Sequence, residues 1–373
     1  MELLEWLWDA VAEPVLSHLG FKAEPTSDAA WPHIRWVTTG RLTKFPIHAA
    51  GYHHQPGCSV LDRVVSSYAF SVSSPIQDLK KDRYANSNRT NAIRSMTLVG
   101  AGQLAFVPLE ISRLERLWDG IQVRKPESCS SEVLDSLKDC DMFHFAGHAQ
   151  AHSADSLKSA LVLDQDRLTV SSLLNINLQS RRPFLAYLSA CGTSRMRRDE
   201  LLNEGLHLVA ALQVSGFRHV IGTLWDVDDE VCVDIAADVY SWMQAHGMDD
   251  RSVSEGLHHA VRKLRAKWIS TDASSRRSDN DAGKDHEARP GPAGDVQVDN
   301  LLDGFGLMRK LRAMDLGGLE GSGLNGRSRQ DPHNTNLEET EQSLGLSKGR
   351  DIADPEESDQ GPFHWVPYAH FGS

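Results

Sequence analysis

The amino-acid sequence predicts an α/β fold, a sandwich of helices around a mainly parallel sheet. Between residues 95 and 268, short apolar runs alternate with stretches whose apolar residues recur every three to four positions. Two of these runs, at 142–146 and 183–190, are almost entirely apolar, as strands covered on both faces are. Alternation of strand and helix is typical of parallel strands joined by crossover helices.

The segment before residue 95 is predicted to contain one helix and three strands. Leucine and valine recur at helical spacing over the first twenty residues, and Gly20 follows as a stop signal. Alternating residues on both sides of a Thr-Gly pair at 33–50 predict a hairpin, and a further strand is expected around 64–68. The polar stretch at 80–91 is expected to be an exposed loop.

From residue 95 onward, each apolar run is assigned to a strand and each periodic stretch to a helix. Thr169 is a suitable N-cap for the helix that follows it. Strands are expected at 96–100, 142–148, 159–163, 183–190 and 219–224, and helices at 108–117, 131–139, 169–174, 204–214, 229–246 and 252–268.

The composition changes at residue 271. Residues 271–361 are rich in glycine, serine, asparagine and acidic residues, so a disordered insert is expected there. Apolar residues at 301–316 predict a short helix, either a transient helix in a linker or an inhibitory or partner-docking element. Residues 362–373 return to aromatic, strand-like sequence. The expected organisation is therefore an N-terminal helix at 1–30, a main domain at 31–270, the insert at 271–361 and a final strand of the main domain at 362–373.

Length and charge limit the classes of function. The 373 residues are enough to bury a substantial core. The formal net charge of -12, without a sustained Lys/Arg stripe, argues against a nucleic-acid partner. The first residues are acidic where a signal peptide would be basic, and no run of about 18 apolar residues occurs. No membrane partner is expected, and the expected location is cytoplasmic.

The cysteines are odd in number and widely spaced. They show neither CxxC spacing nor a clustered partner for zinc, so we expect reduced thiols and no metal. No organic cofactor is expected either. They are Cys58, Cys129, Cys140, Cys191 and Cys232.

Two residues able to support nucleophilic chemistry follow neighbouring predicted strands. His148 ends the run that begins at residue 142, and Cys191 follows the run at 183–190. Functional residues collect beyond the carboxyl ends of parallel strands, and an imidazole there would activate the thiol. The alternative is that Cys191 is a small buried apolar residue, as single cysteines in apolar runs usually are.

Four motifs, taken in order, resemble the CHAT domain family. CHAT proteins are caspase-like peptidases of the clan that also holds separases, metacaspases and gingipains. The resemblance implies a caspase-like three-layer α/β/α sandwich with a mainly parallel central sheet. The motifs are His-Phe-Ala-Gly-His-Ala at 144–149, Leu-Ser-Ala-Cys-Gly-Thr at 188–193, Gly-Thr-Leu-Trp-Asp-Val-Asp-Asp at 222–229 and Trp-Val-Pro-Tyr at 365–368.

The resemblance also implies roles for particular residues. Cys191 would be the nucleophile, and His148 would activate it and protonate the leaving amine. The backbone N–H groups near Ala149 and of Cys191 would form the oxyanion hole. Caspase relatives have glycine directly after the catalytic histidine, whereas this chain has Ala149, which weakens that assignment. His144 is either an outer residue of the site or a satisfied core histidine.

An acidic cluster follows the strand at 219–224. Asp226, Asp228 and Asp229 lie close to where clan members build the S1 pocket, and an acid there would favour a basic P1 residue. The alternative, N-capping of the next helix by Asp228 or Asp229, is equally compatible with the sequence. Asp226 is the best single pocket candidate.

Together these observations predict a cysteine endopeptidase that cleaves protein substrates, with a regulatory protein as a further partner. The resemblance suggests an immune or cell-death pathway. The alternative is a catalytically silent CHAT scaffold that binds a protein partner through the same groove.

Overall fold

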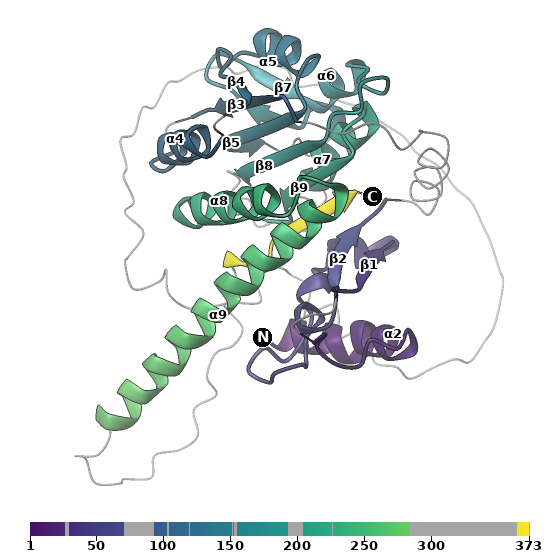
Figure 1. The fold of residues 1–373 in the computed structure, drawn as a ribbon, viewed down its shortest axis with the longest axis vertical. Coiled ribbons are helices and arrows are strands. Elements are labelled where there is room, and N and C mark those ends of the chain that lie inside the picture. The colour runs from purple at the N-terminus through teal and green to yellow at the C-terminus, as the bar shows by residue number, and fades with distance from the viewer. Residues whose placement is uncertain are drawn as a thin grey trace, which may run out of the picture. The chain divides into compact units, whose positions relative to one another are not determined.

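The computed structural model describes residues 1–26, 30–70, 93–102, 104–118, 120–150, 152, 155–192, 204–225, 227–282 and 364–372. Met1–Asp295 and Gly361–Ser373 form one compact unit, which contains all the elements labelled in Figure 1. The second unit, Val296–Gln360, lies outside the described residues.

The centre of the first unit is one sheet in the order β1-β2-β10-β9-β8-β5-β3-β4. All neighbours on this path pair in parallel except β10 and β9, which are antiparallel. The antiparallel strands β6 (Ala160–Val162) and β7 (Arg167–Thr169) extend it from β5. The other strands are β1 (His33–Trp36), β2 (Val65–Tyr68), β3 (Ser95–Gly100), β4 (Gln122–Arg124), β5 (Met142–Gln150), β8 (Leu185–Gly192), β9 (His219–Thr223) and β10 (Tyr368–Gly372).

Helices cover both faces of this sheet. On β5, His144 contacts Glu110 of α4 and Tyr240 of α8, whereas the neighbouring Phe143 packs on Phe217, which follows α7. Side chains alternate between faces along a strand, so α4 and α8 lie on the face opposite α7. The predicted fold class, a three-layer α/β/α sandwich with a mainly parallel sheet, is confirmed (Figure 1). The helices of these layers are α4 (Val107–Leu117), α5 (Ser130–Leu137), α6 (Val170–Asn175), α7 (Glu204–Ser215), α8 (Asp229–Ala245) and α9 (Asp250–Ala282).

The N-terminal helix forms as predicted, in three consecutive pieces. A π-helical stretch at Trp8–Ala12 separates α1 (Glu2–Leu7) from α2 (Glu13–His18). The α6 helix begins at its predicted cap, because the Thr169 side chain accepts a hydrogen bond from the Ser172 amide at 3.0 Å.

The predicted hairpin at 33–50 is wrong. Strand β1 pairs in parallel with β2, and the second half of the segment forms two 3-10 turns, Gly40–Lys44 and Ile47–Ala49. Pro46 has no amide to donate to a strand ladder, which disfavours a second strand there. The His48 amide and ring instead hydrogen-bond the Tyr68 hydroxyl, and the ring also bonds the carbonyl of Val366.

Helix α9 extends beyond the predicted domain boundary. It continues to Ala282, so residues 271–282 are helical where the disordered insert was expected to begin. The rest of the insert, the helix predicted at 301–316 and the loop predicted at 80–91 lie outside the described residues. Among the described helices, none combines the length and apolar character that a membrane crossing requires.

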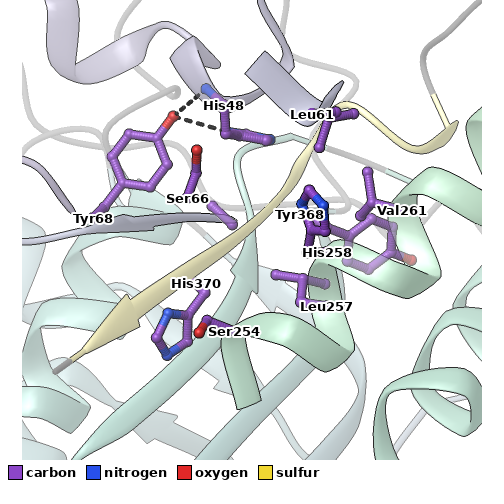
Figure 2. Close-up of a pocket in the computed structure, with 11 residues that line it drawn as sticks. His48, Leu61, Ser66, Tyr68, Ser254, Leu257, His258, Val261, Tyr368 and His370 are labelled. Atoms are coloured by element: carbon purple, nitrogen blue, oxygen red, sulfur yellow. Dashed lines mark hydrogen bonds between the residues drawn. The ribbon is translucent and has the colours of Figure 1, made fainter. Parts of the chain in front are cut away.

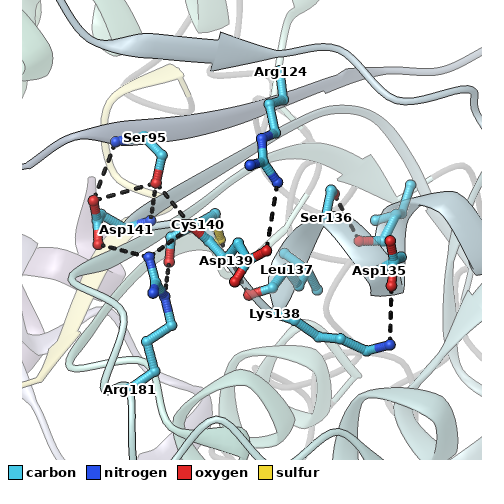
Figure 3. A network of polar contacts seen from close by, with 11 residues as sticks. Ser95, Arg124, Asp135, Ser136, Leu137, Lys138, Asp139, Cys140, Asp141 and Arg181 are labelled. Carbon is cyan, nitrogen blue, oxygen red and sulfur yellow. Dashed lines mark hydrogen bonds and ion pairs between the residues drawn. The ribbon is translucent and has the colours of Figure 1, made fainter.

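A polar network around Asp141 lies at the start of β3 and β5 (Figure 3). The Asp141 carboxylate accepts hydrogen bonds from the amides of Arg94 and Ser95 at 2.9 and 3.1 Å, and the Arg181 guanidinium contacts it at 3.3 Å. The backbone carbonyl of Asp141 accepts from the Phe184 amide, just before β8. The three strands therefore start from one anchored point, which fixes their mutual register.

Candidate active site

The two predicted catalytic residues occupy paired positions on neighbouring parallel strands. Along β5 and β8, the register pairs Ala146 with Ser189, His148 with Cys191, and Ala149 with Gly192. Both strands run in the same direction, so these pairs lie at the carboxyl ends of the two strands. The side chain of Cys191 lies outside the described residues.

The His148 side chain is half-buried and packs against Gly102 in the segment that follows β3. A Cβ atom added to Gly102 would lie 3.3 Å from Cδ2 of His148 and 3.8 Å from Nε2. The Nδ1 atom of His148 is buried and has no hydrogen-bond partner among the described residues. The absence of a side chain at Gly102 therefore leaves room for the ring on this side.

Ala149, the predicted oxyanion-hole residue, lies between two strands. It pairs with Gly192 of β8 and with Leu161 of β6. Because a strand lies on each side, the Ala149 amide can be engaged in the sheet and not be available to an oxyanion. A role for the Ala149 and Cys191 amides in an oxyanion hole stays a prediction.

A buried polar cluster lies four residues before His148 on β5. The carboxylate of Glu110 on α4 contacts Nε2 of His144 at 3.1 Å and accepts a hydrogen bond from the Ser189 hydroxyl at 3.1 Å. The Nδ1 atom of His144 pairs with the Tyr240 hydroxyl at 3.2 Å. His144 is 0% exposed and Glu110 2% exposed, so His144 has the contacts of a satisfied core histidine.

Glu110 was not predicted from the sequence as part of this cluster. A signal existed, because Glu110 lies between Val107 and Leu114 on the stripe that α4 buries. A carboxylate on such a stripe needs buried hydrogen-bond donors, and here they come from β5 and β8.

Asp228 and Asp229 of the acidic cluster accept hydrogen bonds from different backbone amides. Asp228 is exposed and caps α8, because its side chain accepts from the Glu230 amide at 2.9 Å. Asp229 is half-buried and accepts from the Phe106 amide at 3.4 Å. Burial raises the pKa of Asp229, the Glu110 charge adds to the rise, and nearby His148 opposes it. Asp226 lies outside the described residues, so its pocket role stays a prediction.

The model of the CHAT domain family matches residues 1–373. The chain belongs to the CHAT domain family.

Solved structures and curated proteins add little to this assignment. One solved structure that this CHAT chain resembles is the crystal structure of the Arg-specific cysteine proteinase gingipain R, with 14% sequence identity and a TM-score of 0.37. The match covers 54% of this chain and 51% of the gingipain chain, so it spans about half of that protein. No curated protein matches the sequence.

The other cysteines of the CHAT chain differ in burial. Cys58 and Cys129 are half-buried free thiols, and Cys140 and Cys232 are buried. Burial raises the pKa of Cys140 to about 12, so this thiol stays protonated and unreactive at neutral pH. Within the described ranges, no group of three His, Cys, Asp or Glu side chains is arranged to hold a metal ion.

The CHAT domain also has a small cavity, whose lining residues Figure 2 shows. Its lining includes His48 and Tyr68 near the N-terminal turns, His258 on α9 and His370 on β10. Among the described side chains, its lining does not include His148. It is therefore separate from the candidate active site.

Proposed function

We propose that this CHAT domain is a cysteine endopeptidase whose catalytic dyad is Cys191 and His148. The observation that carries the proposal is the register of β5 and β8, in which these two residues are partners at the strand ends. A free thiol has a pKa of about 8.5 and needs a neighbouring imidazole to react at neutral pH. Membership of the CHAT family supports the same chemistry.

The reaction would proceed in two steps. The Cys191 thiolate adds to the scissile carbonyl carbon, and the C–N bond then breaks as the protonated His148 ring gives its proton to the leaving amine. Water next attacks the thioester, with His148 accepting the proton, and the C–S bond breaks to release the acid. Backbone amides near Ala149 and Cys191 would stabilise the oxyanion in both steps.

The proposed substrate is a protein with a basic residue at P1. The support is the acidic cluster at the carboxyl end of β9, next to the strand that carries Cys191. Asp226 and Asp229 are the better candidates, because Asp228 already accepts a helix amide. A carboxylate there would hold an arginine or lysine side chain by a charge-assisted hydrogen bond. We further propose that this protein is cytoplasmic and acts in an immune or cell-death pathway. A regulatory protein would control its activity.

A thiol-directed peptide probe tests the dyad. The wild-type chain is incubated with peptidyl chloromethyl ketones that carry arginine, lysine or aspartate at P1, and the alkylated residue is located by mass spectrometry. Cys191→Ala and His148→Ala are compared with Cys58→Ala and Cys129→Ala, which remove other accessible thiols. Hydrolysis of the matching fluorogenic peptides is measured in parallel.

We expect labelling at Cys191 with the basic peptides, and loss of hydrolysis by at least about a hundredfold in both dyad variants. Cys58→Ala and Cys129→Ala should behave as wild type. Labelling that survives Cys191→Ala would overturn the assignment. Labelling at Cys191 without hydrolysis of any peptide or protein would instead favour the silent scaffold.

A further inference from the structure

Catalytic histidines are usually oriented through the ring nitrogen that does not react. That nitrogen donates a hydrogen bond to a carboxylate or carbonyl, which fixes the tautomer and the direction of the ring. In the described part of this chain, Nδ1 of His148 is buried and lacks such a partner. Some other feature must hold the ring if His148 is to act on Cys191.

Gly102 lies beside the ring. Its φ of +82° is a conformation that residues with a side chain rarely adopt. A Cβ here would approach Cδ2 of His148 to 3.3 Å, closer than an ordinary van der Waals contact. A side chain at position 102 would therefore be strained and would crowd the imidazole.

The sheet topology explains why Gly102 reaches this position. Strand β3 pairs with β5 up to Gly100 and Ala146, and the Ala101 amide still bonds the Ala146 carbonyl. From His148 onward the same edge of β5 pairs with β6 instead, beginning with His148 and Val162. The chain leaving β3 must turn away here, and this turn places Gly102 beside the His148 ring.

Asp164 fixes this turn. It follows β6, two residues after the partner of His148, and its Oδ1 accepts a hydrogen bond from the Gly102 amide at 2.8 Å. The backbone of Asp164 is itself held, because its amide donates to the Ser128 hydroxyl at 3.0 Å. The carboxylate thus joins the end of β3 to the end of β6 beside His148.

We propose that Gly102 and Asp164 are positioning residues for His148. They hold the ring in place by packing, whereas in other sites a hydrogen bond from Nδ1 to a carboxylate does so. The inference rests on the proposed peptidase function. Neither residue touches the substrate. Asp164 acts through Gly102, and Gly102 acts through its contact with the ring.

The test uses the full chain and a matched control. Asp164→Ala removes the acceptor for the Gly102 amide, whereas Asp164→Asn keeps an oxygen at the same place. Asp166→Ala is the control, because Asp166 holds the Ser130 amide and hydroxyl at the start of α5. Gly102→Ala places a methyl group against the ring. The rate of Cys191 alkylation is measured across pH, with thermal unfolding of each variant.

We expect Asp164→Ala and Gly102→Ala to slow alkylation by roughly tenfold or more, since small misplacement of a reacting group is costly. Asp164→Asn should stay within about threefold of wild type. In peptide hydrolysis by Asp164→Ala and Gly102→Ala, kcat should fall without a matching rise in KM. Asp166→Ala should alkylate at the wild-type rate even where it unfolds at a lower temperature. Wild-type rates in Asp164→Ala, or an equal loss in Asp166→Ala, would overturn the proposal.

A second readout does not depend on catalysis. In chains labelled with 13C-histidine, the ring signals of His148, assigned with His148→Ala, should change in Asp164→Ala and Gly102→Ala and not in Asp166→Ala. If wild-type Cys191 proves inert, the peptidase proposal fails while this measurement still reports on the ring. Unchanged ring signals in both Asp164→Ala and Gly102→Ala would show that neither residue positions it.

Discussion

At the scale of single residues, Glu110 is the least expected feature of the fold. A carboxylate that is 2% exposed must recover its lost hydration from hydrogen bonds. Its partners are His144 on β5 and Ser189 on β8, the strands that carry His148 and Cys191. One side chain from α4 thus bridges the two strands a short distance before their ends.

Removing the Glu110 carboxylate should destabilise the fold. Glu110→Ala leaves the His144 ring and the Ser189 hydroxyl without this partner, and we expect a loss of about 1–3 kcal/mol or more in the free energy of unfolding. Glu110→Gln should lose less, because an amide still bonds both groups. Urea denaturation measures the difference. Glu115→Ala, on the exposed side of the same helix, should change stability by less than about 1 kcal/mol. Equal losses in Glu110→Ala and Glu115→Ala would contradict this account.

At the scale of elements, the start of the sheet depends on Asp141. Asp141→Ala should leave the amides of Arg94 and Ser95 without this acceptor, and the Arg181 guanidinium should keep only its backbone acceptors. We expect a loss of about 1–3 kcal/mol in unfolding free energy, together with faster hydrogen exchange at the first amides of β3. Asp139→Ala is the control, because its exposed carboxylate makes only a 3.9 Å ion pair with Arg124. Slow exchange retained in Asp141→Ala would argue against an anchoring role.

The sequence predicted most helices and strands from residue 95 onward, because their apolar periodicity matches their burial. The N-terminal hairpin was wrong, since periodicity over a few residues does not identify the pairing strand. Here the partner of β1 is β2, about thirty residues further on. The end of α9 was also misplaced, because its polar last turns carry no apolar stripe.

The candidate site was predicted only in part. His148 and Cys191 could be found because each ends its own apolar run, and the register then makes them partners. Gly102 and Asp164 could not be found, because each comes from a different element and neither carries a motif. Their relation to His148 depends on where β6 replaces β3 beside β5, which is a property of the folded sheet.

At the scale of the whole molecule, buried histidines should make the protein sensitive to acid. Burial lowers the pKa of His48 and of His53 from 6.5 to about 4, and burial also lowers the pKa values of His219 and His370. The unfolded chain takes up these protons below pH 6.5, whereas the folded chain resists until about pH 4. The contribution of these histidines to the free energy of unfolding is therefore fully present above pH 6.5 and is lost as the pH falls toward 4.

We expect His48 and His53 each to lower the free energy of unfolding by about 2 kcal/mol between pH 7.5 and pH 5. Urea denaturation at the two pH values measures the total. His53→Gln removes one titrating group and should reduce the pH dependence, even where it lowers stability at pH 7.5. A free energy of unfolding that does not change between these pH values would contradict the prediction.

The position of β10 has a consequence for biosynthesis. In the described sheet, β10 lies between β2 and β9, so β1 and β2 join the larger set of strands through it. A growing polypeptide leaves the ribosome from its N-terminus, and contacts between distant segments form late. β1 and β2 are synthesised long before residues 368–372. The edge of β2 that pairs with β10 therefore stays unpaired until β10 has been made. A nascent chain stalled before β10 should therefore recruit chaperones that a released chain does not.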